Sequence, residues 1–330
     1  MSPPRIAAIA IGRNEGARLL ACLDSLAGLD RVVYVDSGST DDSVAAARAR
    51  GAEVVTLDLA RPFTAARARN AGLARLGETG ARPDLVQLID GDCALDPGWL
   101  AAASAFLAAN PCVAVVCGRR RERHPEASLY NRLIDMEWDR PPGRTRACGG
   151  DALMRMDALE AAGGYRESLI AGEEPELCLR LRAAGWEVWR LDAEMTLHDA
   201  DMTRFAQWWQ RARRAGHAAA EGWALHGHSP ERHGVRATLR ALAWAGALPL
   251  TALGTGLLVH PAGLALLLAW PLQVARMARA AGGGRAAWLK SAFELLAKLP
   301  ELVGVLGYAL ARLRARPVRL IEYKGGPSHG

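Results

Sequence analysis

Short, continuous apolar runs alternate with helix-like stretches along the first 110 residues of the chain. The apolar runs predict strands, at residues 6–11, 32–35, 53–57 and 85–89. Between them, the side-chain spacing predicts helices, at residues 17–26, 43–50 and 64–76. Apolar strands that alternate with helices indicate a buried, mostly parallel sheet flanked by helices. We therefore predict an α/β fold, in which ligands bind beyond the carboxyl ends of the strands.

The middle of the chain is less regular. Prolines and a glycine interrupt residues 119–150, which we expect to form a long functional loop and a short helix. Helical spacing returns at residues 153–162 and 176–184, and residues 186–191 are predicted to form another strand. A helix rich in arginine and tryptophan is predicted at residues 205–223.

The character of the sequence changes after residue 240. Residues 241–275 contain no charged side chain apart from the ionisable His260. A bilayer-spanning helix needs about 20 apolar residues, so this run predicts a two-helix hairpin interrupted by prolines. Its second arm is short, which leaves a re-entrant or kinked segment as one alternative. A buried pair of helices in a soluble domain is the other. Residues 288–311 are amphipathic, with an interruption near Pro300, and predict a helix that lies at the membrane surface or packs on the protein.

The charges divide the chain in the same way. Residues 1–200 carry 24 basic and 29 acidic side chains, a net charge of −5, whereas residues 201–330 carry 17 and 6, a net charge of +11. A basic region predicts an anionic partner, and the apolar run beside it favours membrane lipid, so we expect no nucleic acid. Half of the residues are hydrophobic, which excludes a disordered chain. We predict two domains, residues 1–235 and residues 236–330.

The predicted location is the inner (cytoplasmic) membrane, with the first domain in the cytoplasm. Arginines flank the apolar run on both sides, which predicts that both ends of the hairpin face the cytoplasm. The apolar run at residues 6–11 is shorter than the core of a signal peptide. None of the six cysteines forms a C-x-x-C pair, and we expect them to be reduced, buried thiols.

Two carboxylates follow the strand predicted at residues 85–89. Asp90 and Asp92 are separated by Gly91, and in an extended chain the side chains of residues i and i+2 point in the same direction. Carboxylates in this arrangement suit a hard divalent cation such as Mg²⁺ or Mn²⁺ that bridges to phosphate oxygens. Asp36 follows the strand at residues 32–35, where a carboxylate can bind the base or ribose of a nucleotide.

A series of such motifs runs in order through residues 5–200, about 60% of the chain. They are IGRNE (11–15), VDSGSTD (35–41), ARNAG (68–72), DGD (90–92), GGDAL (149–153), GGY (163–165), GEEPELCLRLR (172–182) and His198. In their order and spacing they resemble the motifs of the family 2 glycosyltransferases. The resemblance implies a GT-A fold, a Rossmann-like sheet flanked by helices, here with a helical membrane-associated region at the C-terminal end.

The resemblance also implies roles for particular residues. The nucleotide-sugar would be bound by Glu15, Asp36, Arg69 and Asp90. A divalent metal, Mg²⁺ or Mn²⁺, would be bound by Asp92 together with Asp90 and His198. Gly150 and Asp151 would lie on the side of the acceptor. These assignments come from the family pattern, residue by residue, and not from spacing alone.

The reaction also requires a base that takes a proton from the acceptor hydroxyl. Glu174 stands where the family places its catalytic aspartate, Glu173 is the rival, and Glu176 is a third candidate. The chain departs from the family pattern at several positions. Ile11 and Arg13 replace a proline and a tyrosine, Ser37 replaces an aspartate, and Asp151 replaces an asparagine.

The predicted function is an inverting, hexosyltransferase-like and metal-dependent glycosyltransferase. It would move a sugar from a nucleotide-sugar to a hydroxyl of a lipid-linked or polysaccharide acceptor of the cell envelope. A nucleotidyltransferase of related fold is the first alternative, but it would need a phosphate-binding lysine, and all three lysines follow Trp288. An inactive sugar-binding scaffold is the second alternative, and the retained Asp90, Asp92 and Glu174 disfavour it.

Overall fold

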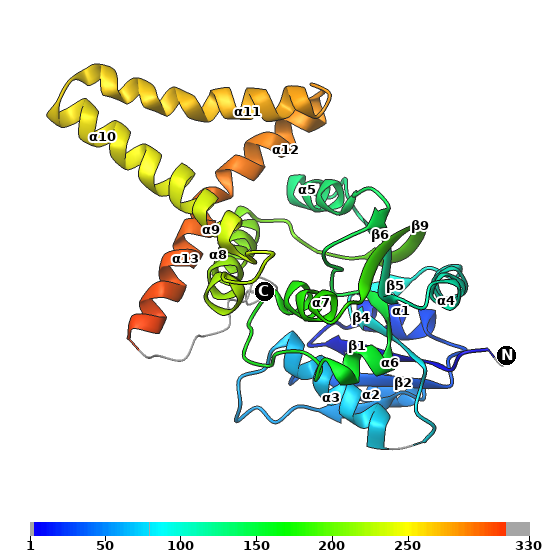
Figure 1. Ribbon diagram of the computed structural model, residues 1–330. Helices are drawn as coiled ribbons and strands as arrows, with labels where there is room; N and C mark the ends of the chain where they lie inside the picture. The colour runs from blue at the N-terminus through cyan, green and yellow to red at the C-terminus, as the bar shows by residue number, and fades with distance from the viewer. Residues whose placement is uncertain (1–2, 79, 315–330) are drawn as a thin grey trace. The chain divides into compact units, whose positions relative to one another are not determined.

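The computed structural model describes residues 3–78 and 80–314, and its contacts divide the chain into two units that meet at Asp201 and Met202 (Figure 1). The domain boundary predicted from the sequence lies at residue 235, whereas residues 202–235 belong to the second unit by their contacts. The reason is that the helix which starts at Phe205 packs against later helices of the chain.

The first unit is built on one mixed sheet. Within the described residues it contains nine strands, with the order β3-β2-β1-β4-β8-β6-β9-β5 and with β7 paired to β9. The strands are β1 Ile6–Gly12, β2 Arg31–Asp36, β3 Glu53–Thr56, β4 Leu85–Asp90, β5 Cys93–Leu95, β6 Val113–Glu122, β7 Gly143–Arg144, β8 Ala152–Arg155 and β9 Glu187–His198. The first four strands are parallel, as their apolar sequences predict.

Helices of the first unit flank the sheet (Figure 1). They are α1 Ala17–Ser25, α2 Ser43–Ala49, α3 Ala65–Glu78, α4 Trp99–Ala109, α5 Leu129–Trp138, α6 Met156–Ala161 and α7 Glu173–Ala183. The chain runs outward from β1 to β3 and then returns through α3 to β4, beside β1. Because such crossovers are right-handed, α3 lies on the face opposite to α1 and α2. The strand order therefore reverses between β1 and β4.

Two predictions for the middle of the chain are wrong. Residues 153–162 were expected to be one helix, but β8 occupies the first part and α6 begins at Met156. The apolar residues Ala152–Met154 pair with β4 and are buried inside the sheet, so tertiary pairing overrides the helical spacing. Residues 119–122 were expected to belong to a loop, but they extend β6 and pair with β9. The predicted short helix in this region is α5.

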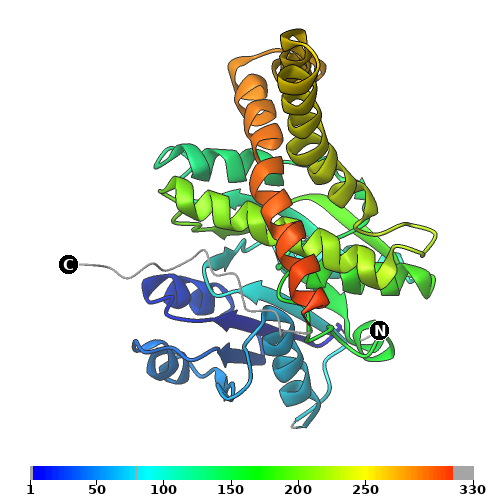
Figure 2. The same cartoon turned by 90° about the vertical axis from the view of Figure 1, so that its left-hand side faces the viewer.

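The second unit is entirely helical in its described part. Its helices are α8 Phe205–His226, α9 Val235–Ala241, η1 Leu242–Ala247, α10 Leu248–Leu258, η2 Pro261–Leu268, α11 Ala269–Ala280, α12 Arg285–Leu296 and α13 Lys298–Leu313. α13 crosses α8, and Figure 2 shows the two helices side by side. Gly216 of α8 and Gly304 of α13 allow this close crossing, because a Cβ at either residue would lie 2.0 Å from a backbone oxygen of the other helix.

The apolar hairpin predicted at residues 241–275 corresponds to two long helical arms. Val235–Leu258 and Pro261–Ala280 have mean hydropathies of 1.5 and 1.2, and both are long and apolar enough to span a bilayer. Their side chains are largely uncovered, and Leu257 and Leu258 are 76% and 86% exposed. The amphipathic stretch predicted at residues 288–311 is divided at Ala297 into α12 and α13, close to Pro300 as expected.

Candidate active site

The predicted site residues gather where the strand order of the sheet reverses. β1 lies between β2 and β4, so Gly12 is level with Asp36 on one side and Ile11 is level with Asp90 on the other. Asp36 and Asp90 are the last residues of their strands. In α/β sheets the crevice at such a reversal, beyond the carboxyl ends, is where ligands bind. The sheet thus brings the two aspartates that were predicted from strand ends to one edge.

Asp36 fixes the turn that follows β2. Its Oδ2 atom accepts hydrogen bonds from the backbone amides of Gly38 and Ser39, both at 3.0 Å, and its Oδ1 accepts one from the Tyr34 hydroxyl at 3.1 Å. Gly38 has a φ of +89°, a conformation that side chains other than glycine rarely adopt. The Asp36 carboxylate is buried and preorganised by these contacts.

Glu15 lies beside the Asp-Gly-Asp turn. A Cβ placed on Gly91 would come within 3.4 Å of the Glu15 Cγ, and one placed on Gly12 within 3.1 Å. The Glu15 carboxylate forms an ion pair with Arg18, at 2.9 Å between Oε2 and Nη2. The loop after β1 therefore places Glu15 next to the end of β4, as its predicted role requires.

Arg69 connects the predicted donor side of the site with the predicted catalytic residues. From α3, its Nη2 contacts Asp90 Oδ1 at 3.0 Å, and its Nη1 contacts Glu173 Oε1 at 3.0 Å and Glu174 Oε1 at 2.8 Å. Arg69 is only 2% exposed, and its guanidinium also lies over the ring of Tyr165. Burial alone lowers the pKa of Arg69, but the neighbouring carboxylates together outweigh it and hold the pKa well above the ordinary value. A buried cation is stable only with such partners.

Glu174 is a buried carboxylate whose pKa lies above its ordinary value. Burial and the charge of neighbouring Glu173 raise its pKa to about 7, although Arg69 acts in the opposite direction. A base with a pKa near the working pH accepts a proton most effectively. The third candidate, Glu176, is 1% exposed and pairs with Arg166 and Arg180, so it stabilises the start of α7.

Gly150 and Asp151 lie against Asp90. A Cβ on Gly150 would come within 2.6 Å of Asp90 Oδ2 and 2.9 Å of Arg69 Nη2, so only glycine fits without displacement. Asp151 is fully buried, and it accepts a hydrogen bond from the Asp90 backbone amide at 3.0 Å and one from Thr196 at 2.8 Å. Both residues therefore position Asp90, and their predicted contact with an acceptor stays a prediction.

Arg120 is a site residue that the sequence analysis does not predict. From β6, its Nη2 lies 3.4 Å from Asp90 Oδ2 and its Nη1 lies 3.3 Å from Asp151 Oδ2, while the guanidinium covers the Trp138 ring. Its neighbours Arg119 and Arg121 point the other way and pair with Glu194. Its inward direction follows from the pairing of β6 with β9, which the run of charged residues 119–123 does not indicate.

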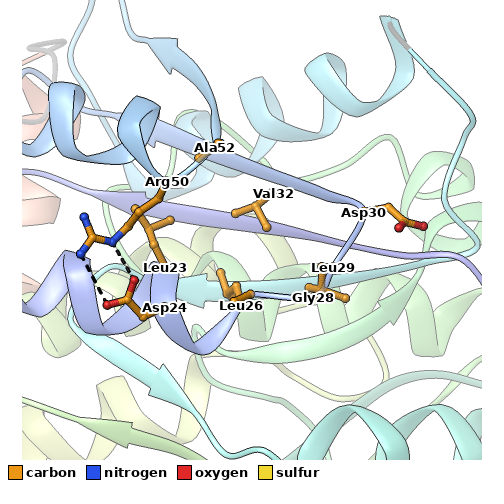
Figure 3. A pocket seen from close by; sticks show the side chains of 11 residues that line it. Leu23, Asp24, Leu26, Gly28, Leu29, Asp30, Val32, Arg50 and Ala52 are labelled. Atoms are coloured by element: carbon orange, nitrogen blue, oxygen red, sulfur yellow. Dashed lines mark hydrogen bonds and ion pairs between the residues drawn. The ribbon is translucent and has the colours of Figure 1, made fainter.

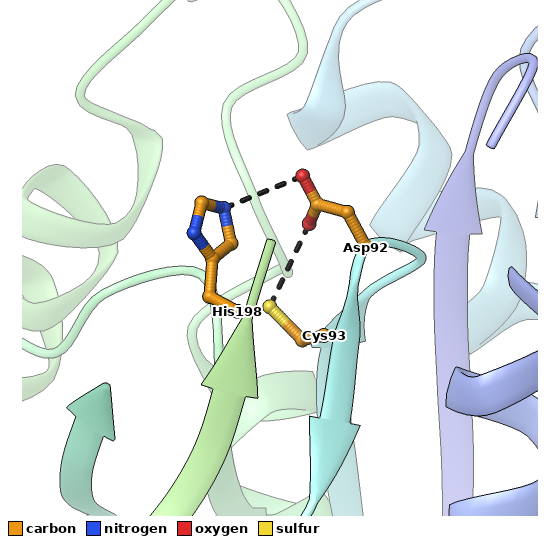
Figure 4. Close-up of side chains that lie close together, drawn as sticks. All are labelled: Asp92, Cys93 and His198. Carbon is orange, nitrogen blue, oxygen red and sulfur yellow. Dashed lines mark hydrogen bonds and ion pairs between the residues drawn. The ribbon is translucent and has the colours of Figure 1, made fainter. Parts of the chain in front are cut away.

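Asp92 belongs to a second cluster of polar side chains, with His198 and Cys93 as its neighbours. His198 Nε2 lies 3.3 Å from Asp92 Oδ2, and Cys93 Sγ lies 3.6 Å from Asp92 Oδ1 (Figure 4). His198 is the last residue of β9, and its Nδ1 lies 3.2 Å from Glu122. Burial and the charge of Arg120 lower the pKa of His198, so the neutral imidazole is favoured.

The residues of the site fit a divalent cation. The four carboxylates of Asp90, Asp151, Glu173 and Glu174 share the guanidiniums of Arg69 and Arg120, and the Asp92 carboxylate lies beside a neutral histidine. The site therefore carries an excess of negative charge in a buried place. Oxygen and imidazole ligands at the end of a strand are a suitable set for Mg²⁺ or Mn²⁺.

A separate cavity lies at the opposite end of the parallel strands, away from the predicted site. It has a volume of about 360 Å³ and is lined by the ends of α1 and α2 and by the loops that follow them (Figure 3). Its rim carries the ion pair between Arg50 and Asp24, with a distance of 2.7 Å. These loops precede β2 and β3, so the cavity is at the amino ends of the strands and is not part of the site.

Comparison with known proteins agrees with this architecture. The profile of "Glycosyl transferase family 2" matches residues 9–171. The pre-mycofactocin glycosyltransferase of Mycobacterium tuberculosis is 30% identical over 224 residues, which are 63% of this chain and 45% of that protein. The succinoglycan biosynthesis protein ExoA of Rhizobium meliloti is 28% identical over 54% of this chain and 58% of that protein. The chain spans about half the length of these curated relatives.

The fold also has a close counterpart among solved structures. The mannosyltransferase PcManGT of Pyrobaculum calidifontis, solved in complex with GDP-mannose and Mn²⁺, superposes with a TM-score of 0.65 at 20% identity. The alignment covers 93% of this chain and 88% of that one. With its GT-A sheet, its ordered motifs and the family profile over residues 9–171, the chain belongs to glycosyl transferase family 2.

Proposed function

We propose that the chain is an inverting glycosyltransferase that moves a sugar from a nucleotide-sugar to a hydroxyl of a lipid-linked or polysaccharide acceptor. The observation that supports it most strongly is the Arg69 cluster. One buried guanidinium contacts Asp90, at the end of β4, and both Glu173 and Glu174, at the start of α7. Groups for holding a donor and for accepting a proton therefore meet within one ion-pair network.

The donor binds, in this proposal, beyond the ends of β1, β2 and β4. Asp36 receives the base or ribose, and Glu15, Arg69 and Asp90 complete the nucleotide side. A nucleotide-sugar is the donor class because the similar PcManGT structure contains GDP-mannose. Ile11, Arg13 and Ser37 differ from the usual family residues, so the identity of the base is left to experiment.

Asp92, Asp90 and His198 hold a divalent cation, Mg²⁺ or Mn²⁺. When bound, the cation neutralises the charge that develops on the diphosphate leaving group. The excess of carboxylates over guanidiniums in the site supports this assignment, and so does the Mn²⁺ in the PcManGT complex. Arg120 holds Asp90 and Asp151 from β6 and so keeps the donor side of the site in place.

Glu174 takes the proton of the acceptor hydroxyl as its oxygen attacks the anomeric carbon. The bond from that carbon to the diphosphate breaks on the opposite side, so a single displacement inverts the anomeric configuration. Its pKa of about 7 leaves a substantial fraction of Glu174 ionised at neutral pH. Glu173 shares Arg69 with Glu174 and orients that guanidinium.

The acceptor reaches the enzyme at the cytoplasmic face of the membrane. Support comes from the two apolar helices and from the net positive charge of the residues around them. Arginine-rich flanks favour the anionic cytoplasmic leaflet. A lipid-linked acceptor would be delivered there by its own membrane anchor, and the resemblance to ExoA, a succinoglycan biosynthesis protein, supports a polysaccharide product.

The test is transfer by the purified full-length protein from a panel of nucleotide-sugars, with Mg²⁺ or Mn²⁺ and membrane lipid extract as acceptor. We expect one donor class to be consumed and the product to have the inverted anomeric configuration by NMR. Glu174→Gln is expected to lower turnover by about 10²- to 10⁴-fold with donor binding retained. Asp92→Asn is expected to abolish activity, and added metal is not expected to restore it. A retained configuration, or full activity of both variants, would refute the proposed mechanism.

A further inference from the structure

Two buried thiols lie in contact within the first unit. The sulfur of Cys148 lies 3.7 Å from that of Cys178, and the two residues are 7% and 0% exposed. All six cysteines of the chain are described, and each is a free thiol. The proposed function uses neither member of this pair.

The two thiols belong to the two segments that carry the predicted catalytic and acceptor-side residues. Cys178 lies on α7, one helical turn after Glu174, and residues i and i+4 of a helix are neighbours on one face. Cys148 lies between β7 and β8, two residues before Gly150. Gly150 is in close contact with Asp90, since a Cβ on it would lie 2.6 Å from Asp90 Oδ2. A covalent bond between the thiols would therefore join both segments of the site.

Cys178 has the lower pKa of the two thiols. The hydrogen bond from the Cys148 thiol lowers the pKa of Cys178, and the charge of Arg182 acts in the same direction, while burial opposes both. The same hydrogen bond and burial raise the pKa of Cys148, which keeps its proton. Arg182 is held beside this segment, because its guanidinium donates a hydrogen bond to the Arg146 carbonyl. Since the thiolate is the reactive form of cysteine, Cys178 is the nucleophile of the pair.

We propose that Cys148 and Cys178 are a site of reversible oxidation, at which a disulfide slows transfer by displacing Gly150. The oxidant is a peroxide, because the pair is nearly closed to solvent and admits only a small molecule. The Cys178 thiolate takes one oxygen as the O–O bond breaks, and the first water leaves. The Cys148 sulfur then attacks the sulfenic sulfur, so that the S–S bond forms, the S–O bond breaks and the second water leaves. The two sulfurs lose the two electrons that reduce the peroxide, and the two thiol protons end in the waters.

The expected displacement is large for a catalytic site. A disulfide bond is about 2.0 Å long, so its formation brings sulfurs that lie 3.7 Å apart closer by about 1.7 Å. Residues 145–151 lie outside any helix or strand and yield more easily than α7, whose first turn is fixed by the pairing of Glu176 with Arg180. Gly150 then shifts against Asp90. A misplacement of about 1 Å can cost about 10²-fold in rate, so we expect the disulfide to lower turnover by about tenfold or more.

The disulfide can be mapped directly. The full-length protein carries Cys112→Ser in all samples, because Cys112 is the exposed cysteine and would form bonds between molecules. After treatment with hydrogen peroxide, the free thiols are alkylated and the digested protein is analysed by mass spectrometry. We expect the peptides of Cys148 and Cys178 to be joined and dithiothreitol to separate them. Turnover should fall and recover in parallel with the disulfide.

Variants distinguish this pair from the other thiols. Cys148→Ala and Cys178→Ala are each expected to keep their turnover in peroxide. Cys117→Ala is the matched control, since Cys117 is also buried but its sulfur contacts the Trp189 carbonyl. It is expected to remain as sensitive to peroxide as the parent protein. Circular dichroism verifies the fold of each variant.

The outcomes separate this inference from the proposed function, on which it rests only for the effect on transfer. Absence of the joined peptides from the oxidised protein would refute the inference, and this measurement needs neither a variant at the pair nor any transfer. A mapped disulfide with unchanged turnover, or reversible inactivation that persists in both folded variants, would refute the effect on the site. No transfer by the reduced protein would refute the proposed function and with it the effect on rate, while the mapping would still decide the site of oxidation.

Discussion

Glu173 and Glu174 are adjacent carboxylates that share one guanidinium but differ in their surroundings. Glu173 is 5% exposed and Glu174 is 15% exposed at the side chain, and both contact Arg69 Nη1. The negative charge of Glu173 is one of the causes that raise the pKa of Glu174. A change at Glu173 therefore acts on the base through electrostatics, even where the geometry of Glu174 is kept.

The rate of transfer is expected to depend on pH through Glu174. Its carboxylate form accepts the proton, so turnover should rise with pH through about 7 and level off above it. Glu173→Gln removes a charge that raises this pKa, so the inflection should move to lower pH. A turnover profile at saturating donor measures both. Glu167→Gln, an exposed carboxylate paired with Arg61, is the control and should leave the inflection unchanged.

Gly149 and Gly150 offer a matched pair of substitutions. A Cβ on Gly150 meets Asp90 Oδ2 at 2.6 Å and Arg69 Nη2 at 2.9 Å, whereas one on Gly149 meets no atom within 4 Å. Gly150→Ala is expected to displace Asp90 and lower donor affinity and turnover by about tenfold or more, as even small misplacements do. Gly149→Ala should be close to wild type. Equal effects in transfer and donor-binding assays would contradict the role assigned to Gly150.

Two charged residues of β6, Arg120 and Glu122, could not be predicted as site residues from the sequence. Asp36 and Asp90 were predictable because each follows a buried apolar run, and the structure places both at strand ends. Arg120 and Glu122 lie in the run of charged residues 119–123, which is typical of a solvated loop. Their inward direction follows only from the pairing of β6 with β9, a contact between distant parts of the chain.

The crossing of α8 and α13 is a close helix contact of the second unit. Gly304 lies against Arg213, and a Cβ there would be 2.0 Å from the Arg213 carbonyl oxygen. The amphipathic pattern of residues 288–311 could be read as a membrane-surface helix or as a packed helix. Here α13 packs on α8 through Gly304 and Val305, while Leu306 remains 54% exposed. That Gly216 lies against Glu301 and Gly304 against Arg213 cannot be inferred from spacing within either helix.

Gly304→Ala is expected to destabilise the second unit. The added methyl group overlaps the α8 backbone, and overpacking of this kind costs about 1–3 kcal/mol. Gly307→Ala on the same helix meets nothing within 4 Å and should stabilise it by up to about 1 kcal/mol, because alanine favours helix. Unfolding in detergent, followed by circular dichroism, measures both. A lower midpoint for Gly307→Ala than for Gly304→Ala would contradict the close crossing.

The whole molecule is predicted to behave as an integral membrane protein. The arms Val235–Leu258 and Pro261–Ala280 expose apolar side chains that ionic washes do not release. We expect the full-length protein to stay in the membrane fraction after high salt and alkaline washing. A charge at the centre of a span costs about 2.5–3.5 kcal/mol, so Leu253→Asp should increase release. Complete release of the unmodified protein would exclude a spanning hairpin.

The contact boundary at Asp201 differs from the division predicted at residue 235, whereas the first four predicted strands are all present. The alternation of apolar runs identified the first four strands, because a buried parallel strand leaves a strong local pattern. The contact boundary at Asp201 depends on α8, whose arginines and tryptophans give no local sign of which helices it packs against. Roles in binding and catalysis remain predictions, since they depend on substrates and not on the fold.

The arms of the hairpin also limit what the protein can do with its product. Between residues 241 and 275 the only ionisable side chain is His260, which begins the turn between the arms. Routes for polar cargo through bilayers are lined by polar or ionisable groups, and these arms provide almost none. Under the proposed function the hairpin serves as an anchor, and it would hold the enzyme in the same leaflet as an acceptor that carries its own lipid.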